Sequence, residues 1–154
     1  MYQRMHNERG FTLVELLIVL SIVSLSLLVA NNSYMTFRES STLNRAARVV
    51  AADVGLARSH AIRNRTSVAL VATEATRSYV IRDAAGTVYL TRVFDATSEM
   101  PLDILNVQIA DDSIVFNSRG LMSSFGTANI DVERNGAGRR VNLNAIGRSQ
   151  ITTY

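Results

Sequence analysis

Close to its amino terminus the chain reads Arg9-Gly10-Phe11-Thr12-Leu13-Val14-Glu15, and an apolar run continues from there to Ala30. A run of about 20 apolar residues is long enough to cross the hydrocarbon core of a bilayer as one α-helix. The only charged residue between Phe11 and Ala30 is Glu15, and a carboxylate inside a membrane segment costs about 2.5 to 3.5 kcal/mol. A charge at that position therefore requires a partner and a function.

Three simpler interpretations of the apolar run are a secretory signal, a permanent single-pass anchor with an incidental glutamate, and a buried helix of a soluble protein. A secretory signal has an apolar stretch of about 7 to 15 residues, followed by a small-residue cleavage site. The present run is longer, and Leu28-Val29-Ala30 is a poor site of that kind. Hydropathy alone does not exclude the anchor. Arg4 and Arg9 precede the run, and they favour a cytoplasmic amino terminus with an exported carboxyl-terminal region.

The stretch Gly10–Glu15, preceded by a short basic leader, resembles the class III signal of type IV pilins and of the pseudopilins of type II secretion systems. This resemblance implies that a membrane-embedded aspartyl prepilin peptidase cleaves between Gly10 and Phe11, removes residues 1–10 and methylates the new amine of Phe11. It also implies that Glu15 pairs with the terminal amine of a neighbouring subunit during assembly. A site of low dielectric strengthens that attraction when geometry lets the charges meet.

Without the leader and the apolar run, about 120 residues remain, which is the usual size of one domain. The absence of cysteine excludes disulfides and cysteine-ligated metals.

All 16 basic residues are arginine, and the formal net charge is +3. Arginines dominate residues 34–82 and 113–154, whereas residues 83–112 hold six acids and one arginine. Genomic base composition is the simplest cause of an arginine-only chain. Arginine also suits phosphates and carboxylates, so the basic regions could contact nucleic acid or neighbouring subunits.

Residues 31–65 are predicted to continue the helix of residues 11–30 as an amphipathic helix. No proline interrupts residues 11–65. Apolar residues recur there at spacings of three and four, which places them on one face. They are Leu43, Ala46, Ala47, Val50, Val54, Ala57 and Ala61. We therefore expect one long helix, with a transmembrane first half and a second half packed against a globular head.

Residues 66–154 are predicted to form that head as an antiparallel β-sheet, which gives the chain an α+β fold. Short runs of β-branched and aromatic residues alternate there with turn signals. The predicted strands are Ser67–Thr73, Tyr79–Arg82, Thr87–Phe94, Val107–Ala110, Ile114–Asn117, Ala128–Glu133, Arg139–Asn144 and Arg148–Thr153. Turns are expected at Asp83–Gly86, Asn117–Gly120 and Asn135–Gly138, and Asp95–Leu105, which contains the only proline, is expected to be a loop.

Two further stretches narrow the family resemblance. Ala57–Arg65 with the strand Ser67–Val71 resembles the helix-to-strand passage of the H-type pseudopilin (GspH) and FimT/FimU minor pilin family, and Ile114–Gly120 resembles its strand-to-glycine turn. The resemblance implies a pilin-like fold and a structural role in priming or capping a type II secretion pseudopilus or a type IV pilus. The implied partners are the prepilin peptidase, other major and minor pilins or pseudopilins, and the bacterial inner membrane, with the head on the periplasmic or extracytoplasmic side.

DNA binding is the alternative function. Some FimT-type members bind DNA during natural transformation through a carboxyl-terminal Gly-Arg-x-Arg element. The corresponding residues here are Gly147-Arg148-Ser149-Gln150, so glutamine replaces the second arginine. Other arginines that could complete a basic edge are Arg119, Arg134, Arg139 and Arg140. Such phosphate contacts depend on salt and read little sequence. A turn at Gly147 with a solvated Arg148 is the simpler interpretation.

The sequence offers little to an enzyme, a metal or a cofactor. Of its two histidines, His6 lies in the leader, which leaves His60 as the only imidazole of the processed chain. Asp103, Asp111 and Asp112 have neither the spacing nor the glycine of an EF-hand. We therefore predict no catalytic residue, no metal site and no cofactor, and we interpret the chain as a substrate of the processing enzyme.

Overall fold

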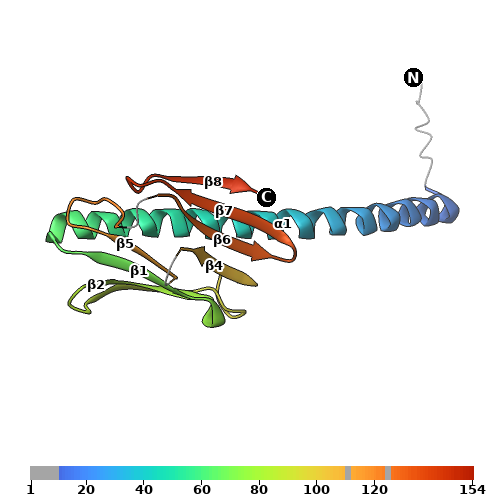
Figure 1. Cartoon of the computed structure of the whole chain (residues 1–154). Helices are drawn as coiled ribbons and strands as arrows, with labels where there is room; N and C mark the ends of the chain where they lie inside the picture. Colours follow the sequence, from blue (N-terminus) through green and yellow to red (C-terminus); the bar gives the residue numbers. More distant parts are fainter. Residues whose placement is uncertain (1–10, 110–111, 124–125) are drawn as a thin grey trace, which may run out of the picture. The chain divides into compact units, whose positions relative to one another are not determined.

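The computed structural model describes residues 11–109, 112–123 and 126–154. Within these ranges the chain forms one long helix, α1 (Leu13–Asn64), eight strands and a short 3₁₀ helix, η1 (Glu74–Thr76) (Figure 1). The strands are β1 (Val68–Thr73), β2 (Ser78–Asp83), β3 (Val88–Val93), β4 (Ile104–Gln108), β5 (Ser113–Phe116), β6 (Ala128–Arg134), β7 (Ala137–Leu143) and β8 (Ser149–Thr153). The chain divides into two compact units, and the second, from Arg38 to Tyr154, contains the head.

The carboxyl-terminal end of α1 is closed by a Schellman motif. Arg65 adopts the left-handed conformation, with a φ of 50°. The amide of Arg65 donates to the carbonyl of Ile62 (3.4 Å), and the amide of Thr66 donates to the carbonyl of Ala61 (3.3 Å). Glycine is the usual residue at the left-handed position because it has no Cβ, and arginine occupies it here. The helix therefore ends one residue before the predicted boundary at 65.

The first half of α1 was predicted to span a membrane. Among the residues that the structure describes, no helix contains a stretch long and apolar enough to meet the requirement for a membrane span.

Two four-stranded antiparallel sheets form the head. One has the strand order β3-β2-β1-β5, and the other has the order β4-β6-β7-β8. In the first sheet β1 pairs with β2 along its whole length, from Val68 opposite Asp83 to Thr73 opposite Ser78. The antiparallel head is as predicted, but the strand pattern of the sequence did not indicate that the strands divide between two sheets.

One predicted boundary in the head is wrong. The loop expected at Asp95–Leu105 is shorter, because Ile104 already pairs with β6. The strand predicted at Val107–Ala110 therefore starts earlier, as β4, and its described part ends at Gln108. Ala110 itself lies outside the described residues. Asn106 separates Ile104 and Leu105 from Val107, so the apolar pattern on which the strand was predicted began only at Val107.

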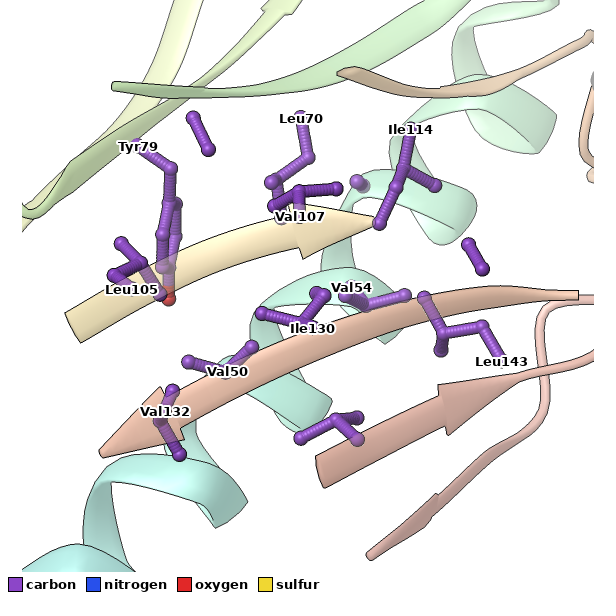
Figure 2. Packing of buried hydrophobic residues seen from close by; sticks show 14 of the residues in the cluster. Val50, Val54, Leu70, Tyr79, Leu105, Val107, Ile114, Ile130, Val132 and Leu143 are labelled. Carbon is purple, nitrogen blue, oxygen red and sulfur yellow. The ribbon is translucent and has the colours of Figure 1, made fainter. Parts of the chain in front are cut away.

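The helix shares one hydrophobic core with both sheets. Every residue of the predicted stripe from Leu43 to Ala61 is at most 1% exposed, which confirms that this face of α1 packs inward. Figure 2 shows Val50 and Val54 among side chains from both sheets. Those labelled are Leu70, Tyr79, Leu105, Val107, Ile114, Ile130, Val132 and Leu143. Full burial of one large aliphatic side chain stabilises a fold by about 1.5 to 3 kcal/mol, so this cluster is the main source of the stability of the head.

A buried carboxylate ties the helix to the first sheet. Asp53 of α1 is 7% exposed. The hydroxyl of Tyr79 donates to its Oδ2 (2.6 Å), and Arg92 donates to both carboxylate oxygens from Nε (3.0 Å) and Nη2 (3.2 Å). Burial, together with the hydrogen bond to Asp53, raises the pKa of the Tyr79 hydroxyl above its usual value. Tyr79 therefore stays protonated and acts as a donor to the carboxylate.

Replacement of Asp53 by alanine is expected to destabilise the head, because Tyr79 and Arg92 lose their common acceptor. Removing one partner of a fully buried ion pair costs about 3 to 5 kcal/mol. The side chain of Arg92 is 35% exposed and can turn to water, so we expect a loss of about 2 to 3 kcal/mol in the free energy of unfolding. Urea denaturation followed by circular dichroism measures it. Glu99→Ala, at an exposed loop position, is the control and should change stability by less than about 0.5 kcal/mol. Equal stability of the two variants would contradict the expectation.

Candidate assembly site and arginine surfaces

The amino-terminal motif forms the start of α1. The amide of Glu15 donates to Oγ1 of Thr12 (3.2 Å), and the amide of Leu16 donates to the carbonyl of Thr12 (3.2 Å). Thr12 is therefore the N-cap, and Glu15 stands three residues later, where a capping box has its acid. The carboxylate also lies at the positive end of the helix dipole. Glu15 and Phe11 are both exposed, whereas Gly10 of the predicted cleavage site lies outside the described residues.

The helix that follows is apolar on every side. Its hydrophobic residues from Phe11 to Leu28 are between 46% and 77% exposed. Three hydroxyls, of Ser21, Ser24 and Ser26, each donate to the carbonyl four residues earlier, at 2.8 Å. These bonds satisfy the serines within the helix and leave no side-chain donor that needs water. A continuous apolar surface of this size marks a region that another apolar surface covers.

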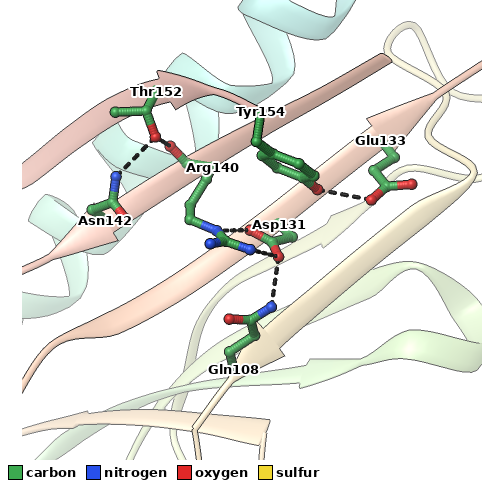
Figure 3. Close-up of polar contacts among 7 residues, drawn as sticks. All are labelled: Gln108, Asp131, Glu133, Arg140, Asn142, Thr152 and Tyr154. Carbon is green, nitrogen blue, oxygen red and sulfur yellow. Dashed lines mark hydrogen bonds and ion pairs between the residues drawn. The ribbon is translucent and has the colours of Figure 1, made fainter. Parts of the chain in front are cut away.

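Arg140 is already engaged by a carboxylate on the outer face of the second sheet (Figure 3). Its Nε and Nη2 donate to the two oxygens of Asp131, at 2.7 and 2.8 Å. Asp131 is only 6% exposed, and it also accepts a bond from Gln108 (2.7 Å). The ring of Tyr154 lies 4.9 Å from the Arg140 guanidinium, and its hydroxyl donates to Glu133 (2.8 Å). A guanidinium held in this way has little capacity left for a phosphate.

Arg139 points to the opposite face of the same strand, because successive side chains of a strand alternate. Its Nε donates to Asn44 of α1 (2.8 Å), and its Nη1 donates to the carbonyl of Gly138 (2.9 Å). Arg134 lies at the end of β6 that adjoins β7 at Ala137, which is the end of the sheet remote from Arg148. The structure therefore does not bring the five predicted arginines onto one edge.

Arg119 and Arg148 do lie at the same end of the head, where α1 ends. Arg119 belongs to the turn Asn117–Gly120, and Arg148 follows the turn Asn144–Gly147. The two turns are joined by a hydrogen bond from the amide of Met122 to the carbonyl of Ala145 (3.1 Å). Both arginines are exposed. These two are the members of the predicted set that the fold places together.

Arg58 of α1 belongs to the same surface and was not predicted. Its Nε donates to the carbonyl of Gly120 (2.9 Å). A Cβ at Gly147 would lie 2.9 Å from Cδ of Arg58 and 2.9 Å from Phe116. Both glycines have positive φ, 73° for Gly120 and 72° for Gly147, so each turn needs glycine for its backbone and for the space beside the helix. The two turn glycines were visible in the sequence, but their common neighbour was not.

The Gly147–Gln150 element forms a turn and the start of β8. The amide of Arg148 donates to Oδ1 of Asn144 (2.9 Å), and Gln150 pairs with Asn142 of β7. A pocket of about 490 Å³ lies beside the element, lined by Thr127, Asn142, Leu143, Asn144, Arg148, Ser149 and Gln150. Its lining residues carry one positive charge and no negative charge.

His60 lies on the surface of α1. Its ring stacks on Tyr89 with centroids 4.2 Å apart, and its Nδ1 lies 3.3 Å from Nη2 of Arg63. Among the described residues no three His, Cys, Asp or Glu side chains gather as metal ligands would. Asp111 of the acidic pair lies outside the described residues.

Comparison with known families identifies both halves of the chain. The model of the prokaryotic N-terminal methylation motif matches residues 5–31, and the model of the type II transport protein GspH matches residues 46–147. The chain belongs to the GspH family. No curated protein is significantly similar to it in sequence. The methylation motif of this GspH-family chain covers the N-cap and the exposed apolar turns. The GspH match covers the buried stripe of α1 from Ala46 onward and the strands up to the turn at Gly147.

Two solved structures share the pilin-like fold of this GspH-family member. Both are crystal structures of the type IV minor pilin FimU of Pseudomonas aeruginosa (strain PAO1), in different space groups. The first has a TM-score of 0.60 at 22% identity and covers 75% of this chain and 92% of FimU. The second has a TM-score of 0.57 at 19% identity and covers 71% and 92%. The predicted pilin-like α+β class is confirmed.

The contact between Arg58 and the two turns can be tested with a pair of matched glycine substitutions. Gly136→Ala places a Cβ in open space at a φ of 77°, whereas Gly147→Ala places one against Arg58 and Phe116 at a φ of 72°. A left-handed backbone costs an alanine about 1 to 2 kcal/mol in either case. Overpacking adds about 1 to 3 kcal/mol at Gly147 alone. Thermal and urea unfolding measure the difference, and equal losses in the two variants would show that the turn at Gly147 has room.

Proposed function

We propose that this GspH-family chain is a minor pilin or pseudopilin, a structural subunit that primes or caps a type II secretion pseudopilus or a type IV pilus. The observation that carries the proposal is the composition of α1, which joins an exposed apolar segment behind a methylation motif to a stripe buried in the head. The first part supplies a surface for packing between subunits. The second part packs into the core of the head.

In this proposal the precursor inserts in the bacterial inner membrane through residues 11–30, with its amino terminus cytoplasmic and its head periplasmic. Prepilin peptidase then cleaves between Gly10 and Phe11, and the amine of Phe11 is methylated. Support comes from the match of the methylation motif over residues 5–31 and from the serines that bond within the helix, since hydrocarbon offers no other partner for a hydroxyl. Other pilins or pseudopilins are the partners of the processed chain.

Glu15 is proposed to guide the subunit into the filament. Among apolar helices its carboxylate has no water to solvate it, so it favours a position beside the terminal amine of a neighbouring Phe11. The backbone amide of Glu15 bonds the side chain of Thr12, and Glu15 stands at the position where a capping box has its acid. Pairing needs the negative charge of Glu15, whereas capping does not. A neutral glutamine can therefore replace Glu15 in capping but not in pairing.

Substitution of Glu15 separates these two roles. Glu15→Gln keeps a residue that suits a capping box but removes the charge, and Glu15→Ala removes both. If charge pairing guides docking, both variants should reach the membrane and be cleaved normally, yet both should fall at least about tenfold in sheared filaments, since about 1.4 kcal/mol of lost pairing is tenfold in an equilibrium. Immunoblots of membrane and filament fractions measure this. Normal incorporation of Glu15→Gln would assign the residue to capping alone.

Substitution of Gly10 tests processing. Gly10→Ala adds a Cβ at the proposed cleavage site, so the precursor should remain uncleaved and stay out of filaments. It would then carry ten residues more than the mature chain. Mass spectrometry of the intact protein measures the leader and the methyl group of Phe11. Gln3→Ala changes the leader away from the cleavage site, keeps both leader arginines and serves as the control. Filaments that contain the uncleaved Gly10→Ala protein would contradict the proposal.

The alternative function is that of a DNA receptor, with Arg148 and Arg119 as the contacting residues and Arg134, Arg139 and Arg140 as lesser ones. The exposure of Arg148 beside a pocket without acids supports it. The pairing of Arg140 with Asp131 and of Arg139 with Asn44 weighs against a role for those two.

Gel-shift titration of the full chain in mild detergent, over a range of salt concentrations, tests the alternative. A receptor should bind duplex DNA at micromolar concentration and lose affinity steeply with salt. Gln150→Arg, which restores the second arginine of the element, should then strengthen binding, and Arg148→Ala should weaken it. If neither the unsubstituted chain nor Gln150→Arg gives a salt-sensitive shift, DNA binding is excluded as its function.

A further inference from the structure

The end of the head where α1 terminates carries an apolar patch that the fold leaves uncovered. Ile62, Leu121 and Ile146 are 46%, 40% and 47% exposed. They are neighbours, because a Cβ at Gly120, next to Leu121, would lie 2.6 Å from Cδ1 of Ile62, and the loop of Ile146 is bonded to Met122 through Ala145. We name these three residues, with the turns Asn117–Gly120 and Asn144–Gly147, the turn-end surface.

Two hollows lie in the turn-end surface, and residues of the loop Ala145–Gly147 line both. The first is about 310 Å³ and is lined by Gly55, Arg58, Ser59, Ile62, Arg63 and Gly147. The second is about 330 Å³ and is lined by Asn117, Leu121, Met122, Ser123, Ala145 and Ile146. Each can receive one side chain of a partner, since a buried aliphatic or aromatic anchor in a pocket is the common centre of a protein interface.

The rim of the turn-end surface is positive. Arg58 and Arg63 line the first hollow, and Arg119 and Arg148 stand on the two turns. None of the residues that line either hollow is acidic. The surface therefore complements a partner that presents apolar side chains with carboxylates around them.

The combination of an apolar centre and an arginine rim favours a protein over a nucleic acid. Protein interfaces are enriched in arginine around an apolar core, whereas surfaces that bind DNA are polar and strongly basic throughout. Arg58 is fixed by its bond to Gly120 and by the two turn glycines. A surface held in this way loses little side-chain freedom on binding, which favours affinity.

We propose that the turn-end surface docks an acidic, apolar-tipped surface of another pilin-type subunit, with the two hollows as the anchor sites. The proposal rests on the function proposed above, since it takes its partner from the same filament. Arg119 and Arg148 supply the charge recognition, and Ile62, Leu121 and Ile146 supply the apolar contact. Arg58 is a positioning residue, because it holds the two turns against the helix.

The full chain, expressed in its own host with its filament machinery, gives a direct test because it contains no cysteine. A single cysteine at Ile146 is labelled with a maleimide photocrosslinker, and the crosslinked peptide is identified by mass spectrometry. Ile104→Cys is the matched control, since Ile104 is 44% exposed and lies at the start of β4. We expect Ile146→Cys to crosslink to another pilin subunit within a few residues of its carboxylates, and Ile104→Cys not to reach that peptide.

Charge reversal then tests recognition. Arg119→Glu, introduced with Ile146→Cys, should lower the crosslink yield at least tenfold, and a carboxylate-to-arginine change at the crosslinked site of the partner should restore it. Arg45→Glu makes the same change of charge at an exposed position of α1 and should leave the yield unaltered. Incorporation of the labelled chain in filaments without a pilin crosslink, or with crosslinks to DNA or lipid, would overturn the docking surface alone. Absence of the unsubstituted chain from filaments would instead overturn the proposed function, and the docking proposal with it.

Discussion

The head depends on the close approach of α1 to two sheets at once. Four of the seven residues of its buried stripe are alanines, and all four are fully buried. An alanine contributes little apolar area, but it lets the larger side chains of the sheets reach the helix backbone. The large core residues therefore come mostly from strands, with Leu70, Tyr79 and Ile130 among them. The small inward face of α1 therefore lets strands of both sheets pack closely on one helix and share a core.

Local patterns in the sequence were sufficient for the elements of this fold. The spacing of apolar residues between Leu43 and Ala61 predicted the inward face of α1, and turn signals placed most strands to within two residues. The division into two sheets was not predictable, because strand pairing is decided by contacts between distant segments. The early start of β4 was missed for the same reason, since pairing with β6 determines it.

The arginines of the candidate sites also depend on contacts that the sequence does not predict. Sequence position grouped Arg139 with Arg140, yet the alternation of a strand sends one to Asn44 and the other to Asp131. Arg58 donates a hydrogen bond to Gly120, although the two residues are sixty-two positions apart in the sequence. A motif read along the chain, such as Gly10–Glu15, depends on order alone and was matched by a family model. A surface built from the end of a helix and two separate turns has no such signature.

The contact of Asp53 with Tyr79 and Arg92 bears on how the head opens as well as on how stable it is. Those two partners lie on adjacent strands, β2 and β3, and the carboxylate lies on the helix. Separation of the first sheet from the helix would leave a carboxylate facing a vacated apolar surface. Fluctuations that release one layer and keep the other are therefore disfavoured, and amide hydrogens of β2 should exchange in concert with those of the second half of α1. The polar contact makes two packed layers behave as a single unit of local unfolding.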